Sequence, residues 1–240
     1  MFKAVFFDFG DTLADISGAS KKALKERPEK QVLTKQGFKF SNKEFDLALK
    51  KMKEKTNLIP YSIKQNDWLI YSRTLLQELG IKRPSKKLTI ECENAYYSRL
   101  SKQVKLMPGT LSILEFLKKK RFILCVISNT RTDSSLKMAK RLKVRKYFAH
   151  FIMSHEFGSP KSEVEIFHEM LRRINRGKKE KILPRECLMV GDNLIEDGAA
   201  KKLGMKVAIL KPTVKREEEL DKIRPEYVLN SLKDLEKIVR

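Results

Sequence analysis

The stretch Ala4-Val5-Phe6-Phe7-Asp8-Phe9-Gly10 near the start of the chain decides the fold. Residues 4–7 are apolar without interruption and a glycine closes the segment, which is typical of a buried parallel strand that opens into a turn. A carboxylate at the end of a buried strand costs free energy unless a cation or hydrogen-bond donors hold it. Asp8 is therefore the first candidate functional residue.

The sequence beyond this stretch alternates short apolar runs with segments of helical spacing. Five further apolar runs lie at residues 122–127, 151–153, 187–190, 207–210 and 227–229. Such alternation predicts an α/β fold, in which helices cover both faces of a parallel sheet.

The region between the first two predicted strands has a different character. Residues 15–106 are rich in lysine and lack compact apolar runs. Apolar side chains recur there at helical spacing, as at Phe45, Leu49 and Met52. We expect residues 15–106 to form a second, helical domain inserted after the first strand, and residues 1–14 and 107–240 to form the α/β core.

The chain is strongly basic, with 52 Lys+Arg against 30 Asp+Glu and a net charge of +22. Residues 15–106 hold 21 basic and 10 acidic residues, and residues 107–240 hold 30 and 18, so the excess forms no single tail. Such a field attracts phosphorylated metabolites, nucleic acid or acidic surfaces. Nucleic-acid binding is the minor alternative, because a basic composition alone is a weak signal. The lysine abundance also fits a thermophile.

Several patterns bear on the compartment. The first ten residues include Asp8 and lack a small-residue cleavage site, which is unlike a signal peptide, and no apolar run approaches the roughly 20 residues that span a bilayer. Cys125 and Cys187 lie inside apolar runs and no CxxC pair occurs, which indicates buried thiols. We expect a cytoplasmic protein with no membrane partner; no pattern indicates its oligomeric state.

Polar residues follow three of the predicted strands: Asp8, the pair Ser128 and Asn129, and Asp192. Side chains at the carboxyl ends of an open parallel sheet face one crevice. Two carboxylates on neighbouring strands repel each other without a counter-charge, and Mg²⁺ with oxygen ligands satisfies both. Asp197, five residues beyond Asp192, is either a further ligand or an anchor.

Two other groups suit a phosphorylated substrate. Ser128 supplies a hydroxyl, and Lys161 supplies a point charge for a phosphoryl oxygen. Together with an aspartate nucleophile and a metal ion, these groups favour phosphoryl transfer.

Four segments in order resemble the motifs of the haloacid dehalogenase-like hydrolase superfamily: Asp8–Leu13, Ile127–Thr130, Gly158–Lys161 leading into Glu165–Phe167, and Val190–Asp197. The resemblance implies a Rossmann-like core with a helical cap inserted after the first motif. It also implies that Asp8 attacks phosphorus and that water hydrolyses the resulting aspartyl-phosphate.

The same resemblance assigns the remaining site residues. The implied oxygen ligands of Mg²⁺ are Asp8, the Gly10 carbonyl and Asp192, with Asp197 in support. The groups implied for the transferred phosphoryl group and its loop are Ser128, Lys161 and Asn129.

The chain departs from the family pattern at Gly10, where most of these phosphatases carry an aspartate that acts as general acid and base. Loss of such a group costs about 10²–10⁴-fold in rate. Asp11 and Asp15 are the two candidate replacements, although aspartate readily serves turns and helix caps, the interpretation we favour for Asp11.

The sequence thus favours a Mg²⁺-dependent phosphatase that acts on a small phosphorylated metabolite. A 2-haloacid dehalogenase would use the same aspartate without a metal, and Gly191-Asp192 with Asp197 argues against it. A protein that only binds a phosphorylated ligand or a macromolecule through a degenerate site gains support from Gly10 and from the net charge.

Overall fold

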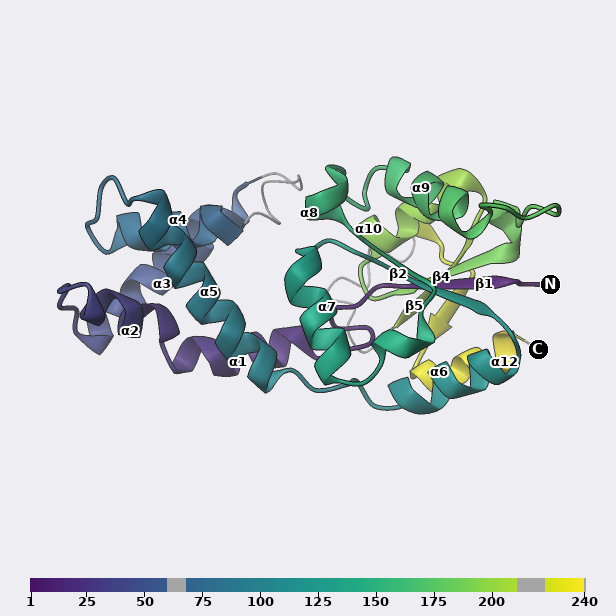
Figure 1. Ribbon diagram of the computed structural model, residues 1–240, viewed down its shortest axis with the longest axis horizontal. Coiled ribbons are helices and arrows are strands. Elements are labelled where there is room, and N and C mark those ends of the chain that lie inside the picture. The colour runs from purple at the N-terminus through teal and green to yellow at the C-terminus, as the bar shows by residue number, and fades with distance from the viewer. Residues whose placement is uncertain (60–67, 211–222, 240) are drawn as a thin grey trace. The chain divides into compact units, whose positions relative to one another are not determined.

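The computed structural model describes residues 1–59, 68–210 and 223–239 of the chain (Figure 1). It divides into two compact units, one formed by residues 1–17 and 105–240 and the other by residues 18–104. The boundaries between the units lie after Ser17 and after Val104, whereas the sequence predicted them after residues 14 and 106.

The core unit contains a six-stranded parallel sheet with the order β3-β2-β1-β4-β5-β6. Its strands are β1 (Ala4–Phe7), β2 (Ile123–Ser128), β3 (His150–Met153), β4 (Cys187–Gly191), β5 (Lys206–Leu210) and β6 (Tyr227–Leu229). Every residue of β1 is buried, because β2 and β4 flank it and helices cover both faces. The predicted α/β fold is confirmed, and so is the burial of Cys125 and Cys187.

Helices and short 3₁₀ segments connect the strands of the core. The helices are α6 (Thr110–Lys119), α7 (Thr132–Arg141), α8 (Ser154–Phe157), α9 (Glu165–Ile174), α10 (Leu194–Gly198) and α12 (Leu235–Ile238). The 3₁₀ segments are η2 (Arg145–Tyr147), η3 (Pro184–Glu186), η4 (Ala199–Leu203) and η6 (Leu232–Asp234). The best-defined apolar face belongs to α9, whose buried residues recur at helical spacing and join the core cluster beneath β2 and β3: Ile166, Phe167, Met170, Leu171 and Ile174.

The chain leaves the core unit and returns to it at one place. Met107 N–H donates to Leu13 O at 3.0 Å, and Asp15 N–H donates to Lys105 O at 2.9 Å. Between them, Ala14 and Leu106 form an antiparallel bridge. These contacts make a short two-stranded stem at the base of the insertion.

The second unit is helical throughout the part that the structure describes. Its helices are α1 (Ile16–Lys25, which starts in the core unit), α2 (Pro28–Lys35), α3 (Asn42–Asn57), α4 (Trp68–Glu78) and α5 (Lys86–Gln103). Phe45, Leu49 and Met52 all lie on the buried face of α3, as their spacing predicts, and pack into a separate apolar core. Among the described helices of the whole chain, none has the length and apolar character needed to cross a bilayer.

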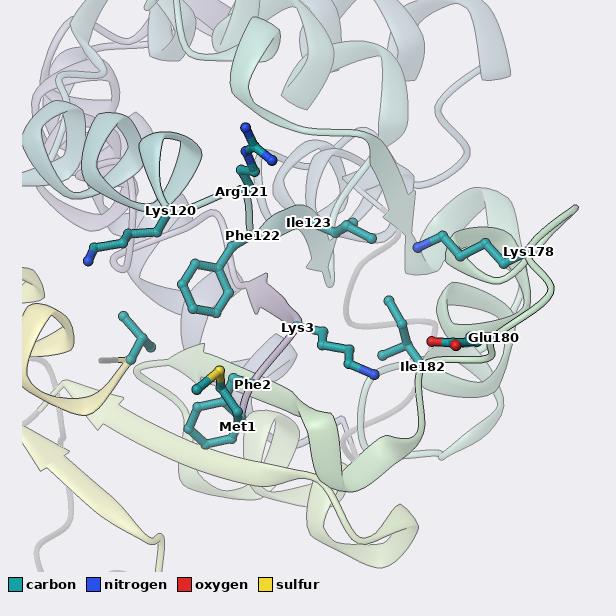
Figure 2. Close-up of a pocket in the computed structure, with 11 residues that line it drawn as sticks. Met1, Phe2, Lys3, Lys120, Arg121, Phe122, Ile123, Lys178, Glu180 and Ile182 are labelled. Atoms are coloured by element: carbon teal, nitrogen blue, oxygen red, sulfur yellow. The ribbon is translucent and has the colours of Figure 1, made fainter.

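A cavity of about 560 Å³ lies at the amino-terminal ends of β1 and β2, where Lys3 and Ile123 precede or begin the strands (Figure 2). It belongs to the core unit alone. The carboxyl ends of the same strands carry the polar residues described next.

Candidate active site

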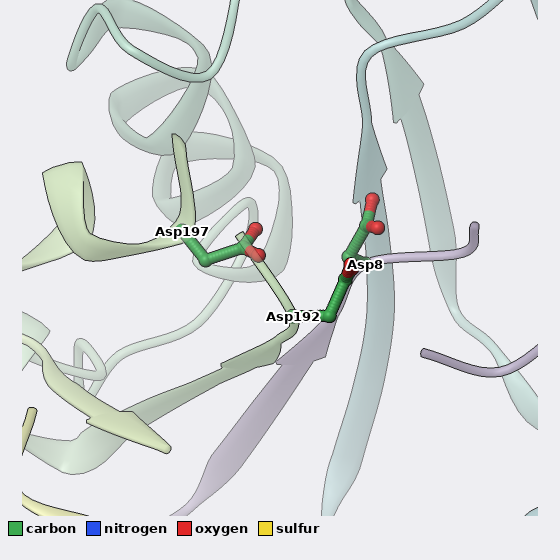
Figure 3. A group of neighbouring side chains, drawn as sticks. All are labelled: Asp8, Asp192 and Asp197. Atoms are coloured by element: carbon green, nitrogen blue, oxygen red, sulfur yellow. The ribbon is translucent and has the colours of Figure 1, made fainter. Parts of the chain in front are cut away.

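Asp8 and Asp192 stand at the carboxyl ends of two adjacent strands (Figure 3). Asp8 directly follows β1, and its backbone N–H donates to Val190 O of β4 at 2.9 Å. The chain continues from β1 to β2 on one side and later returns to β4 on the other. The two carboxylates therefore lie where the strand order reverses, which is the usual ligand-binding position in open α/β sheets.

Asp197 completes a group of three carboxylates. Asp8, Asp192 and Asp197 each place one carboxylate oxygen within 4.8 Å of the others. Burial, together with the charges of Asp8 and Asp197, raises the pKa of Asp192 to about 8. This excess of buried negative charge, presented by hard oxygen donors, fits a divalent cation such as Mg²⁺. Gly10, whose carbonyl was the fourth expected ligand, lies two residues beyond Asp8 in a bridge with Ala14.

Lys161 is buried among these carboxylates, although it lies in the loop between α8 and α9. Its ammonium nitrogen is 2.7 Å from Asp197 Oδ1, 2.8 Å from Asp8 Oδ1 and 3.6 Å from Glu196 Oε2. Burial disfavours the charged ammonium, but the three carboxylates together raise the pKa of Lys161 well above its ordinary value. Lys161 is therefore a fixed positive charge at physiological pH.

The loops that carry the site are joined by hydrogen bonds to backbone groups. Asn129 Oδ1 accepts from the backbone N–H of Lys161 at 2.9 Å, which ties the end of β2 to the Lys161 loop. Asp197 Oδ2 accepts from the backbone N–H of Asn193 at 2.9 Å. The Asn193 side chain in turn caps α10, so the loop after β4 is held from both ends.

One polar group at the end of β2 has no protein partner within the described residues. The Asn129 amide nitrogen is buried and donates to no protein group. The Ser128 side chain is buried at the last position of the strand, next to Asn129 in sequence. Buried donors are normally satisfied, so the Asn129 amide indicates the position of a ligand with acceptor oxygens.

Two residues of the site, Thr12 and Glu196, were not predicted from the sequence. Thr12 is fully buried, and its hydroxyl donates to Asp192 Oδ1 at 3.2 Å. Glu196 is buried beside Lys161. The acidic pair Glu196–Asp197 is visible in the sequence, but the pattern alone does not indicate that both side chains reach the lysine.

Asp11 has the structural role that the sequence analysis favoured. Its backbone is left-handed with φ of 54°, and its carboxylate accepts hydrogen bonds from Ser17 N–H, at 2.8 Å, and from the Ser17 hydroxyl. It therefore holds a turn and the first turn of α1, and the turn-and-cap interpretation is confirmed. Asp15 lies at the stem, where its N–H donates to Lys105.

Comparison with known proteins identifies relatives over nearly the entire chain. The profile of the haloacid dehalogenase-like hydrolases matches residues 2–204. A glyceraldehyde 3-phosphate phosphatase of Pyrococcus furiosus is 28% identical over 97% of this chain and 91% of its own length. A second enzyme of that name, from Methanothermobacter thermautotrophicus, is 31% identical over 82% of this chain and 80% of its own. A 2-haloacid dehalogenase from Pseudomonas syringae is 24% identical with a TM-score of 0.73, covering 100% of this chain and 98% of that chain, and shares the fold.

Proposed function

The chain belongs to the haloacid dehalogenase-like hydrolase family, and from that premise we propose that it is a Mg²⁺-dependent phosphatase acting on a small phosphorylated metabolite. The observation that carries the proposal is the position of Lys161, which lies between Asp8 and Asp197 and is hydrogen-bonded to Asn129, whose amide nitrogen is buried without a partner among the described residues. A phosphoryl group placed there would meet a nucleophile, a cation and this donor together.

The reaction proceeds in two displacements at phosphorus. An Asp8 carboxylate oxygen forms a bond to phosphorus while the bond to the leaving alkoxide breaks, and the alkoxide takes up a proton. A water molecule then attacks the aspartyl-phosphate, which releases inorganic phosphate and restores the Asp8 carboxylate. Lys161, Ser128 and Asn129 bind the phosphoryl oxygens and keep phosphorus within reach of Asp8.

Three groups would hold the metal ion directly, the carboxylates of Asp8 and Asp192 and the carbonyl of Gly10, with the Asp197 carboxylate in support. Bound Mg²⁺ supplies positive charge that offsets the charge of the phosphoryl oxygens. Asp197 shares its two oxygens with Lys161 and the Asn193 N–H, so we assign it mainly to anchoring the lysine. Thr12 orients Asp192 through its hydroxyl.

For the substrate, we propose a triose phosphate or another small sugar phosphate. This class rests on the relatives from Pyrococcus furiosus and Methanothermobacter thermautotrophicus, both named for glyceraldehyde 3-phosphate.

The dehalogenase alternative is disfavoured by the carboxylate group after β4. Displacement of halide from carbon needs no metal, whereas the three carboxylates of Asp8, Asp192 and Asp197 carry more negative charge than the single ammonium of Lys161 offsets, which favours a further cation. The shared fold with a dehalogenase does not separate the two activities, because one fold hosts many reactions.

The deciding experiment is a phosphate-release assay on glyceraldehyde 3-phosphate and a panel of sugar phosphates, with Mg²⁺ and with EDTA, and with chloroacetate as a separate substrate. We expect Mg²⁺-dependent phosphate release that Asp8→Asn abolishes, and no halide release. Halide release that survives EDTA would establish the dehalogenase instead. Phosphate release retained by a folded Asp8→Asn protein would remove Asp8 as the nucleophile.

A further inference from the structure

The cavity at the amino-terminal ends of β1 and β2 is separate from the proposed catalytic site (Figure 2). The two sites share no residue, and the four residues of β1 place about 13 Å of strand between them. Its volume of about 560 Å³ lies within the range of about 300–1,000 Å³ that is typical of small-molecule sites. The cavity is therefore large enough for a ligand of its own.

Part of the cavity wall is apolar. The side chains come from the strand starts and from segments next to them: Phe2, Phe122, Ile123, Ile182 and Val239. Phe122 and Ile182 are 9% and 6% exposed, whereas Phe2 and Ile123 are half-buried. This wall offers a surface against which a flat apolar group can pack.

The rest of the wall is cationic. Four basic side chains line the cavity, Lys3, Lys120, Arg121 and Lys178, against one carboxylate, that of Glu180. Lys3 is neutralised by Glu186, whose carboxylate lies 2.8 Å from the lysine nitrogen. The other three cations exceed the single acidic group, so the cavity has a net positive charge.

These three cations have no salt bridge within the described parts of the chain. The Lys120 ammonium lies 5.9 Å from the centre of the Phe116 ring, and the structure gives Arg121 and Lys178 no ion pair. Basic residues commonly follow a helix C-terminus, which accounts for Lys120 and Arg121 just after α6. Lys178 lies in the loop after α9, four residues past the end of that helix, so the helix dipole does not account for it.

We propose that this cavity binds a nucleoside di- or triphosphate, with the base against the apolar wall and the phosphates near Lys120, Arg121 and Lys178. Three cations without an ion pair among the described residues, set against one carboxylate in the same wall, match a ligand with several negative charges better than a monocarboxylate. Inorganic phosphate would leave the apolar wall uncovered. A nucleoside phosphate combines both requirements in one molecule.

The test is calorimetric titration of the full-length protein in EDTA with ADP, adenosine and pyrophosphate. EDTA prevents Mg²⁺-dependent turnover at the catalytic site. We expect ADP to bind saturably, and adenosine and pyrophosphate each to bind at least about tenfold more weakly, because each offers only half of the recognised features.

The variant that removes the site is Arg121→Gly combined with Lys178→Gln, and its matched control is Lys143→Gly combined with Lys140→Gln. Arg121 and Lys143 both have left-handed backbones, with φ of 64° and 60°, so glycine suits either position. Lys140 and Lys143 are exposed and outside the cavity. We expect the first pair to weaken ADP binding at least about tenfold and the control pair to change it less than about twofold.

Three results would overturn the proposal: no saturable ADP binding below about 1 mM, an equal loss in both variant pairs, or pyrophosphate binding as tight as ADP. Circular dichroism must show that each variant is folded. If the double variant is unfolded, Arg121→Gly alone is compared with Lys143→Gly, and equal ADP affinities for these two would reject the site.

Discussion

The carboxylate of Asp197 occupies the space that a side chain at Gly191 would need. A Cβ atom added to Gly191 would lie 1.9 Å from Asp197 Oδ2 and 2.1 Å from Asp197 Cγ. The last residue of β4 must therefore be glycine if Asp197 is to reach Lys161. The close approach of the Asp197 carboxylate therefore explains why position 191 lacks a side chain.

We expect Gly191→Ala to lower kcat/KM by about 10²-fold or more, because it displaces Asp197 and with it the Lys161 ammonium. Steady-state kinetics check this; a folded Gly191→Ala protein with nearly the original kcat/KM would mean that the position of Asp197 does not matter for turnover.

Replacement of Asp192 by alanine should abolish Mg²⁺ binding at the crevice. Asp192 contributes one of three carboxylates that meet there, and a hard cation held by few protein ligands tolerates the loss of one poorly. Calorimetric titration with Mg²⁺ measures the effect. Thr12→Val is the milder comparison, since it removes only the hydroxyl that donates to Asp192, and we expect it to weaken rather than abolish binding. Undiminished affinity in Asp192→Ala would move the metal site elsewhere.

The glycine at position 10 predicts a dependence on the leaving group. Para-nitrophenolate departs with little protonation, whereas a sugar alkoxide needs a proton, so para-nitrophenyl phosphate should be hydrolysed faster than alkyl phosphates. Gly10→Asp should raise the rate on alkyl phosphates about tenfold or more, and the rate on the aryl ester less. The backbone at Gly10 accepts a side chain, as the space around it shows.

Kinetics on both esters check that prediction, with Asp11→Asn and Asp15→Asn as companions. The Asp11 carboxylate is hydrogen-bonded to Ser17, so the substitution Asp11→Asn should act by disturbing the loop. We expect it to lower the hydrolysis rates of both esters equally. A folded, metal-binding Gly10→Asp protein without selective gain would mean that another group already donates the proton. Asp15 would be that donor if Asp15→Asn, and not Asp11→Asn, lowered the rate on alkyl phosphates more than the rate on the aryl ester.

Glu29 gives the helical unit a pH-dependent stability. Burial raises its pKa from 4.5 to about 7, and one of its carboxylate oxygens has no hydrogen bond to the described groups. The folded state holds the proton more tightly than the unfolded state. The contribution of Glu29 to the free energy of unfolding is therefore greatest below about pH 4.5, and it declines as the pH rises to about 7.

Glu29→Gln should remove this loss and raise the free energy of unfolding at pH 8 by up to about 3 kcal/mol, while changing it little at pH 4.5. Urea unfolding followed by circular dichroism at the two pH values measures the difference. Glu54→Gln on the exposed face of α3 is the control, and we expect less than about 0.5 kcal/mol at either pH. An equal gain for Glu29→Gln at both pH values would show that the side chain's charge is not the cause.

The strands were predictable from the sequence because each contains a short apolar run, which is followed by a polar residue or, in β4, by Gly191 and Asp192. The same pattern predicted that Asp8 and Asp192 lie at one edge of the sheet. The inward position of Glu196 was not predictable, because in the first turn of α10 either acidic side chain could face the lysine. The burial of Glu29 depends on how α2 packs in the helical unit, which no local pattern in the sequence encodes.

For Lys161, the functional role was predictable from the sequence but the burial of its side chain was not. Its position after Gly158-Ser159-Pro160 indicated a role in phosphoryl binding, but a lysine in a polar loop is ordinarily exposed. Its burial arises from three carboxylates contributed by two different segments. Long-range electrostatics of this kind appear only when the strand order is known.

The stem formed by Leu13–Asp15 and Lys105–Met107 has an evolutionary consequence. Because the outgoing and returning chains are hydrogen-bonded to each other, the two ends of the 87-residue segment between Ser17 and Lys105 are held together within the core unit. Domain insertions are best tolerated where the two ends of the inserted segment are close together. An insertion at this stem can therefore vary in length and in fold while the chain segments that lead to β1 and β2 keep their positions in the core unit.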